Sequence, residues 1–131
     1  MLILLLHTLI EATVAFLFLF YPEAGDLVPG FGTSEGPSFE LLMKMYGLSA
    51  AFLAGLTLIA YFSRANRVLV LTITGTLSIF HLLMAGIQAF WNPDPRAGLL
   101  HFLLGILLGG IYMRYRKQAW IERHPDRVRL N

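Results

Sequence analysis

Five ionisable side chains interrupt the apolar stretches of this sequence, and ionisable groups inside membranes usually carry function. They are His7, Glu11, Lys44, His81 and His101. His7 and Glu11 are four residues apart, which places them on the same face of a helix. Imidazoles and a carboxylate could bind a metal ion such as zinc, iron or copper, pass protons, or hold the polar head of a lipid-like ligand. Alternatively, they pair with one another and only fix the packing of the helices.

Counting residues from the centre of each apolar stretch, at about 1.5 Å per residue, sorts the polar side chains into two layers. The central layer consists of His7, Glu11 and His81. The outer layer consists of Lys44, His101 and Gln88. We expect the central layer to hold a metal ion, a ligand or a relayed proton, and the outer layer to line the entrance.

Composition predicts the elements that must position these side chains. The chain has 131 residues, of which 56% are hydrophobic and 14% are charged, whereas soluble domains carry about 25% charged residues. Four apolar stretches are long enough to cross a hydrocarbon core of about 30 Å: residues 2–21, 39–62, 68–91 and 97–115. The sequence therefore predicts an all-α integral membrane protein with a single transmembrane domain. The absence of cysteine excludes a disulfide scaffold, a thiolate metal site and a cysteine nucleophile.

The connections predict how the spans are arranged. Residues 63–67 and 92–96 are short links, so successive spans should be antiparallel neighbours in an up-down four-helix bundle. Ser38 and Asp94 are the expected N-caps of the second and fourth helices, with Pro95 at the first position of the fourth.

Small and polar residues at spacings of three and four predict the inward face of each helix, because lipid-facing positions favour large apolar side chains. For the first helix this face is Leu4, His7, Glu11, Ala15 and Phe18. For the second helix it is Glu40, Lys44, Gly47, Ala51, Ala54, Leu58 and Tyr61. The small residues of Gly105-x-x-x-Gly109 would let another helix approach the fourth one closely.

The distribution of charge predicts the orientation. Arg64 and Arg67 lie in the second connection, and further basic residues follow the fourth span. The first connection has no Lys or Arg but carries Glu23, Asp26 and Glu35. Basic residues favour the cytoplasmic side, so both termini should be cytoplasmic, with the protein in a cell (inner) membrane. Residues 116–131 should form a basic cytoplasmic tail that contacts anionic lipid rather than nucleic acid.

Two short apolar segments carry a family resemblance. They are Ile79-Phe80-His81-Leu82-Leu83 in the third span and LHFLLGILL, residues 100–108, in the fourth. Together with Gly47 and the short Arg-flanked second connection, they resemble the DoxX-like superfamily of small four-span membrane proteins. Members tend to carry a Gly–Lys pair near the end of the first span, where this chain has Tyr21-Pro22. The resemblance implies a four-span fold. Members of the superfamily are linked to quinol-dependent oxidation, stress responses and membrane-protein assembly. The resemblance implies no catalytic residue in this chain.

Four functions are compatible with these features. The leading hypothesis is a binding protein whose polar seam holds a small or lipid-like ligand, with a quinone, a lipid or a metal ion as the cofactor. The second is a proton- or ion-coupled transporter that acts as a homodimer, because a small chain needs a partner to enclose a pathway. The third is a membrane-embedded enzyme with a His/Glu centre, and the fourth is an assembly factor for membrane proteins. The Gly- and Pro-rich first connection is long enough to act as a lid.

Overall fold

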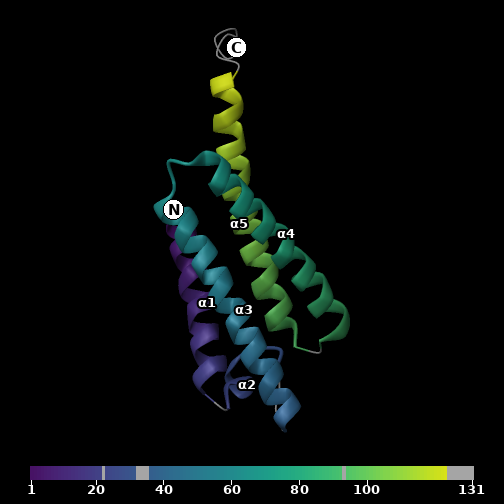
Figure 1. Ribbon diagram of the computed structural model, residues 1–131. Helices are drawn as coiled ribbons and strands as arrows, with labels where there is room; N and C mark the ends of the chain where they lie inside the picture. The colour runs from purple at the N-terminus through teal and green to yellow at the C-terminus, as the bar shows by residue number, and fades with distance from the viewer. Residues whose placement is uncertain (22, 32–35, 93, 124–131) are drawn as a thin grey trace.

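The computed structural model describes residues 1–21, 23–31, 36–92 and 94–123, and these residues form helices and no strand. The helices are α1 (Leu2–Phe20), α2 (Ala24–Leu27), α3 (Pro37–Phe62), α4 (Arg67–Trp91) and α5 (Pro95–Arg123). Four of them, all except α2, are long and apolar enough to cross a membrane. Figure 1 shows that each long helix runs in the direction opposite to the one before it. The prediction of an all-helical protein is confirmed for the described residues, which include four helices long and apolar enough to cross a membrane.

One predicted helix cap is wrong and one is confirmed. α3 has Gly36 as its N-cap and Pro37 at its first position, where the missing proline N–H costs no hydrogen bond, so Ser38 already lies inside the helix. At the start of α5, the Asp94 carboxylate accepts a hydrogen bond of 3.0 Å from the backbone N–H of Arg96. This is the bond that an N-cap side chain makes.

The fourth span is longer than the sequence predicts. α5 continues through residues 116–123, which were expected to belong to a separate basic tail. An ion pair between Arg67 and Glu122 joins the last turn of α5 to the first turn of α4. Residues 124–131 of the expected tail lie outside the described residues.

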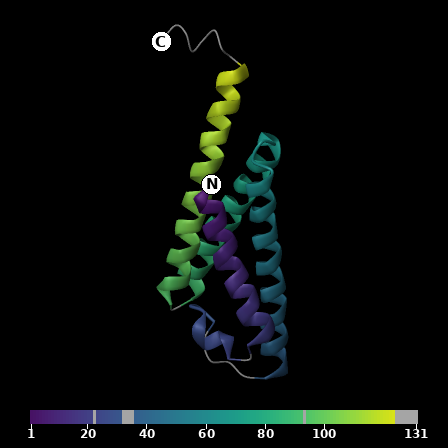
Figure 2. The ribbon, with the colours of Figure 1, turned by 90° about the vertical axis from the view of Figure 1, so that its left-hand side faces the viewer.

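The long helices associate as two pairs. α1 packs along α3 and α4 packs along α5, whereas the pairs contact one another less extensively (Figures 1 and 2). A glycine permits the close approach within each pair. A Cβ atom at Gly47 of α3 would lie 2.9 Å from the Cβ of Phe18, and one at Gly105 of α5 would lie 2.8 Å from the Cγ of Leu82. The hydroxyl of Ser78 also donates to the Gly105 carbonyl across the second pair, at 2.8 Å.

The core is divided along the helix axes. One apolar cluster surrounds Leu4, Val70 and Leu108 near the start of α1. A second cluster surrounds Phe18 and Met43 near the end of α1. The buried face of α1 runs from one cluster to the other and carries two polar side chains between them. The functional candidates therefore lie in a polar layer between two apolar ones.

A short segment crosses the end of the molecule where α1 and α4 finish (Figure 2). We call residues 24–31 the strap, and this end of the molecule the strap end. The strap contains α2 and continues to Phe31, whose ring packs against Phe18 and Tyr46. Gly30 has a positive φ of 94° and sits against the α4–α5 connection, where a Cβ atom would lie 2.6 Å from the Nδ2 of Asn92. Both its backbone conformation and its surroundings favour glycine.

Candidate metal-binding site

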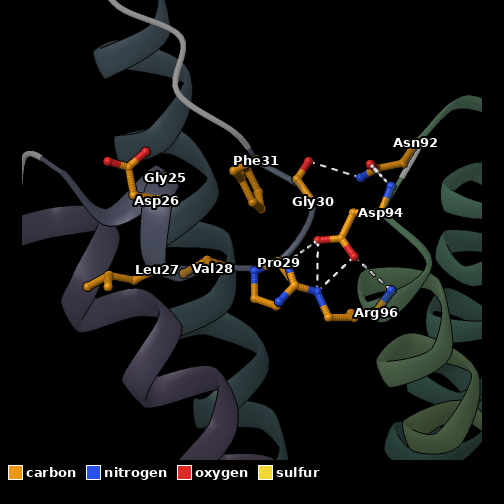
Figure 3. A pocket seen from close by; sticks show the side chains of 10 residues that line it. All are labelled: Gly25, Asp26, Leu27, Val28, Pro29, Gly30, Phe31, Asn92, Asp94 and Arg96. Atoms are coloured by element: carbon orange, nitrogen blue, oxygen red, sulfur yellow. Dashed lines mark hydrogen bonds and ion pairs between the residues drawn. The ribbon is translucent and has the colours of Figure 1, made fainter.

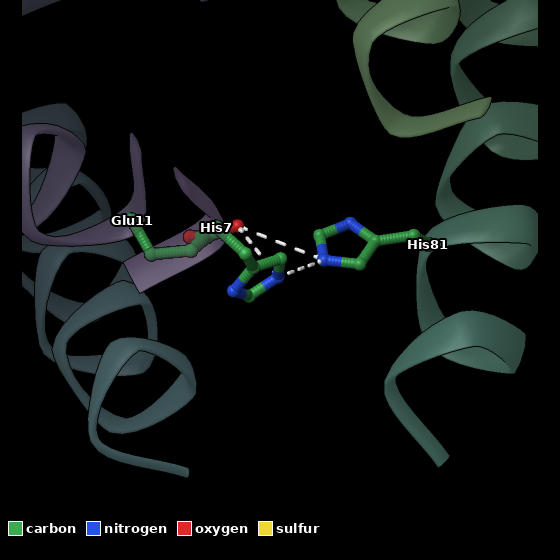
Figure 4. A group of neighbouring side chains, drawn as sticks. All are labelled: His7, Glu11 and His81. Atoms are coloured by element: carbon green, nitrogen blue, oxygen red, sulfur yellow. Dashed lines mark hydrogen bonds and ion pairs between the residues drawn. The ribbon is translucent and has the colours of Figure 1, made fainter. Parts of the chain in front are cut away.

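Two histidines face each other across the interface between the helix pairs. His7 comes from α1 and His81 from α4, and their Nε2 atoms are 2.7 Å apart (Figure 4). The rings meet edge to face, with an interplanar angle of 76°. Both side chains are fully buried. A buried imidazole pair at this distance needs a hydrogen bond or a shared ligand between the two nitrogens.

The carboxylate of Glu11 completes a group of three. Its Oε1 atom lies 3.8 Å from Nε2 of His7 and 3.7 Å from Nε2 of His81. One ligand atom from each residue lies within 4.8 Å of the other two, and all three side chains are buried. The structure thus brings together the three residues of the predicted central layer. Since His7 and Glu11 are one turn apart on α1, His81 is the residue that the fold must supply.

The second ring nitrogen of each histidine, Nδ1, contacts a residue outside the group of three. Nδ1 of His7 lies 3.2 Å from Oγ1 of Thr57 on α3. Nδ1 of His81 lies 3.0 Å from Nδ1 of His101 on α5, and these two rings stack at an interplanar angle of 29°. α3 and α5 therefore each contribute one contact that orients a histidine of α1 or α4. Histidines that bind metals are commonly oriented in this way through their second nitrogen.

The threonine hydroxyl indicates which nitrogen of His7 carries a proton. Oγ1 of Thr57 lies 2.8 Å from Oγ1 of Thr8, whose hydroxyl donates to the Leu4 carbonyl, and 3.1–3.2 Å from the carbonyls of Leu53 and Ala54. With the Thr57 proton directed to one of these acceptors, Thr57 accepts a hydrogen bond from Nδ1–H of His7, and the Nε2 lone pair of His7 points at His81 and Glu11. In this protonation pattern, Nε2–H of His81 donates to that lone pair and Nδ1 of His81 accepts from His101.

The predicted outer layer does not form as a group. His101 contacts the central layer through His81 instead. The amino group of Lys44 lies 3.4 Å from the Glu40 carboxylate, and both side chains are half-exposed or more. The side chain of Gln88 is hydrogen-bonded to that of Asn92. Thr57 was missed at the sequence level, because the predicted inward face of the second span has Leu58 at this turn, whereas the structure buries Thr57.

The spacing of the three donors is close to that of a metal site. Ligand bonds of about 2.0–2.1 Å in tetrahedral geometry separate ligand atoms by about 3.3–3.4 Å. The three separations here are 2.7, 3.7 and 3.8 Å, so shifts of a few tenths of an ångström would equalise them. Hollows of about 390–780 Å³ occur elsewhere on the described residues, and their lining does not include these three side chains. The spacing of the three donors therefore suits a single ion.

Comparisons with known proteins assign neither the fold nor the site to a family. Comparison with protein-family models, with curated proteins and with solved structures finds no match. The resemblance to the DoxX-like superfamily stays a prediction. The chain is therefore characterised by its own geometry, as four membrane-length helices with a buried His–His–Glu group between two pairs.

Proposed function

We propose that this protein is an integral membrane protein that binds one divalent transition-metal ion, such as Zn²⁺, between its two helix pairs. The ligands would be Nε2 of His7, Nε2 of His81 and the carboxylate of Glu11. The observation that carries the proposal is the convergence of these three donors within 4.8 Å in a buried layer. A carboxylate and two imidazoles are a common ligand set for zinc and for non-haem iron.

The proposed setting is an up-down bundle in which the metal lies near the middle of the membrane. Arg64 and Arg67 at one end, and the acidic residues Asp26 and Glu23 at the other, favour a cytoplasmic position for both termini. The strap then lies at the outer face. A metal ion in this layer would also compensate the charge of the Glu11 carboxylate, which is costly to bury alone.

Three protein ligands leave a coordination position for water or a substrate. This is the arrangement of catalytic rather than structural metal sites, because structural zinc is usually held by four protein ligands. Bound metal would supply a Lewis acid or an activated water. The protein's own contribution is to exclude solvent and to orient both imidazoles through Thr57 and His101.

We expect the Glu11→Gln variant to bind Zn²⁺ at least about 100-fold more weakly than the unmodified chain, because an amide oxygen replaces an anionic ligand. The measurement is competitive titration of the purified, detergent-solubilised protein with Zn²⁺ and a chromophoric chelator. Glu40→Gln is the matched control, since Glu40 is exposed and its carboxylate pairs with Lys44 in the same helix. Equal affinities of the two variants would exclude Glu11 as a ligand, and an unmodified protein that binds no Zn²⁺ would remove the proposal.

Thr57→Val should weaken Zn²⁺ binding by about 10- to 100-fold, because the nearly isosteric change removes the acceptor for Nδ1–H of His7. Thr74→Val is its control. Thr74 is equally buried, but its hydroxyl donates to the Val70 carbonyl of its own helix. The same chelator competition measures both variants. Parallel losses in the two would mean that the effect comes from burying a valine rather than from His7.

Proton movement is a second candidate, favoured by the unbroken series of contacts from His101 through His81 and His7 to Thr57. Hydrogen-bonded imidazoles can pass protons by exchanging donor and acceptor roles. This function predicts proton flux into liposomes in the presence of a strong chelator, with loss of flux in His81→Ala. The metal-binding function predicts no flux under those conditions.

A further inference from the structure

The strap contacts the α4–α5 connection at Gly30. The Gly30 carbonyl accepts a hydrogen bond of 2.9 Å from Nδ2 of Asn92 (Figure 3), and the backbone amide of Gly30 also favours the ionised form of the Asp94 carboxyl by lowering its pKa. Asn92 and Asp94 belong to the α4–α5 connection, whereas the strap follows directly from α1. These contacts of Gly30 therefore join the α1/α3 pair to the α4/α5 pair at the strap end.

The Asp94 carboxylate is kept ionised. The guanidinium of Arg96 binds Asp94 with nitrogen–oxygen distances of 2.9 to 3.2 Å. This ion pair, with the backbone N–H groups of Arg96 and Gly30, lowers the pKa of Asp94 to about 2. The carboxylate remains charged throughout the physiological pH range.

Phe31 of the strap packs against the apolar cluster that lies between Glu11 and the strap end. The ring of Phe31 lies 4.5 Å from that of Phe18 and 4.8 Å from that of Tyr46, both as centroid distances. Phe18 is on the same buried face of α1 as Glu11, two turns closer to the strap end. The three rings form an apolar plug between Glu11 and the outside.

A hollow of about 430 Å³ lies outside this plug, between the strap and the α4–α5 connection. Asp26 of the strap, Asp94 and Arg96 are among the residues that line it. Figure 3 shows the Arg96 guanidinium beside the Asp94 carboxylate, and the Asp26 carboxylate on the far side of the strap from both. The hollow is large enough for a hydrated cation, and two carboxylates against one guanidinium give it a net negative formal charge, which favours cations.

We propose that the strap is the gate of the metal site, so that a divalent cation reaches Glu11 from the strap end only when Gly30 separates from Asn92 and Asp94 and Phe31 leaves its two aromatic partners. The inference rests on the proposed metal-binding function. A gate changes the rates of loading and release by the same factor and leaves the affinity unchanged, because it makes no contact with the bound ion. Rate and affinity therefore distinguish a gate from a structural element.

The first test measures how fast Zn²⁺ is released from the full-length, detergent-solubilised protein after a strong chelator is added. Phe31→Ala should release Zn²⁺ at least about tenfold faster, because it removes two aromatic contacts that hold the strap closed. Its equilibrium affinity for Zn²⁺ should stay within about twofold of the unmodified value. Phe90→Ala is the matched control, since Phe90 lies near the same end of the molecule, is 83% exposed and makes a ring contact with Trp91. It should leave both quantities unchanged.

The second test weakens the other contact of the strap. Asn92→Asp removes the Nδ2–H donor to the Gly30 carbonyl and to Gln88 but keeps the oxygen that accepts from the backbone N–H of Asp94. Release of Zn²⁺ should be at least about threefold faster, with affinity within about twofold of the unmodified value, because the lost hydrogen bond favours the open strap. Asn66→Asp is the matched control, since Asn66 caps the other end of α4, where its side-chain oxygen accepts from the backbone N–H of Leu69.

The outcomes separate the gate from the function on which it rests. Release rates in Phe31→Ala and Asn92→Asp equal to that of the unmodified protein would overturn the gate while leaving metal binding intact. A loss of affinity in Phe31→Ala with an unchanged release rate would also overturn it and assign the strap a purely structural role. Absence of Zn²⁺ binding in the unmodified protein would overturn the proposed function itself, and the gate with it.

Discussion

Replacing His81 with alanine is expected to reduce Zn²⁺ affinity by about 1000-fold, equivalent to about 4 kcal/mol. This is the largest effect on binding that we expect from a single substitution. His81 is fully buried and uses both ring nitrogens, one toward His7 and one toward His101. Its loss removes one of three ligands and the only ligand from the α4/α5 pair. Chelator competition gives the affinity, and thermal unfolding of the metal-free protein shows how much stability is lost with it.

His101→Ala provides the comparison for this experiment. His101 contacts His81 but lies outside the group of three donors, so its removal should lower affinity by about 10- to 100-fold. The His101→Asn variant keeps a side chain that can hydrogen-bond to His81, so it should recover part of the lost Zn²⁺ affinity. The Co²⁺-loaded protein adds an independent readout, because its visible spectrum reports the number and type of ligands. If His101→Ala abolishes binding and His81→Ala does not, the ligand assignment is wrong and His101 takes the place of His81.

The second large effect concerns the packing that carries His7 and Glu11. Gly47→Leu should destabilise the protein by about 3 kcal/mol, because the new side chain collides with α1. A Cβ atom at this position already lies 2.9 Å from the Cβ of Phe18 and 3.3 Å from the Ala15 carbonyl oxygen. The backbone contact cannot be relieved by a change of rotamer. Unfolding in a mixed detergent series measures the stability, and Zn²⁺ affinity should fall with it as α1 is displaced.

Gly55→Leu is a close control for Gly47→Leu. The two glycines lie in the same helix, and a Cβ atom at Gly55 has no neighbour within 4 Å. We expect the stability of this variant to equal that of the unmodified protein within about 0.5 kcal/mol. Similar losses in both variants would show that leucine is disfavoured along α3 in general, and that the α1–α3 contact is looser than the structure indicates.

The buried face of α1 could be predicted residue by residue. The five predicted positions, Leu4 to Phe18, are the ones that the structure buries. This succeeded because His7 and Glu11 lie well inside an apolar helix, where a polar side chain must face protein. The two residues therefore fix the rotation of the helix about its axis.

The face of α3 was predicted only in part, for the opposite reason. Glu40 and Lys44 were used to orient this helix, but they lie at its end, where charged side chains can pair with each other and reach solvent. They do not constrain the rotation of the helix. Gly47 and Ala54 are buried as predicted, but the structure buries Ala50, Thr57 and Ala60 where the sequence predicted the residues that follow each of them.

Contacts between distant segments explain what else the sequence did not predict. His101 was placed by its depth along the chain in a different layer from His81, but α4 and α5 approach closely at Gly105 and the two imidazoles meet. Gly30 and Asn92 are 62 residues apart, and the strap contact depends on the space available at the α4–α5 connection. A single sequence carries no local signal for either contact.

α5 is longer than a helix needs to be to cross a hydrocarbon core, so a small tilt of it moves its far end by several ångströms. The helix has 29 residues, hence a length of about 43 Å, whereas the hydrocarbon core is only about 30 Å thick. His101 lies near one end of this rod, and Arg123 lies about 33 Å further along it. A tilt of about 5° with His101 as the pivot would displace the far end by about 3 Å. The ion pair between Arg67 and Glu122 joins the far part of α5 to α4 and opposes such a tilt. A rearrangement around His81 and His101 would therefore strain this ion pair.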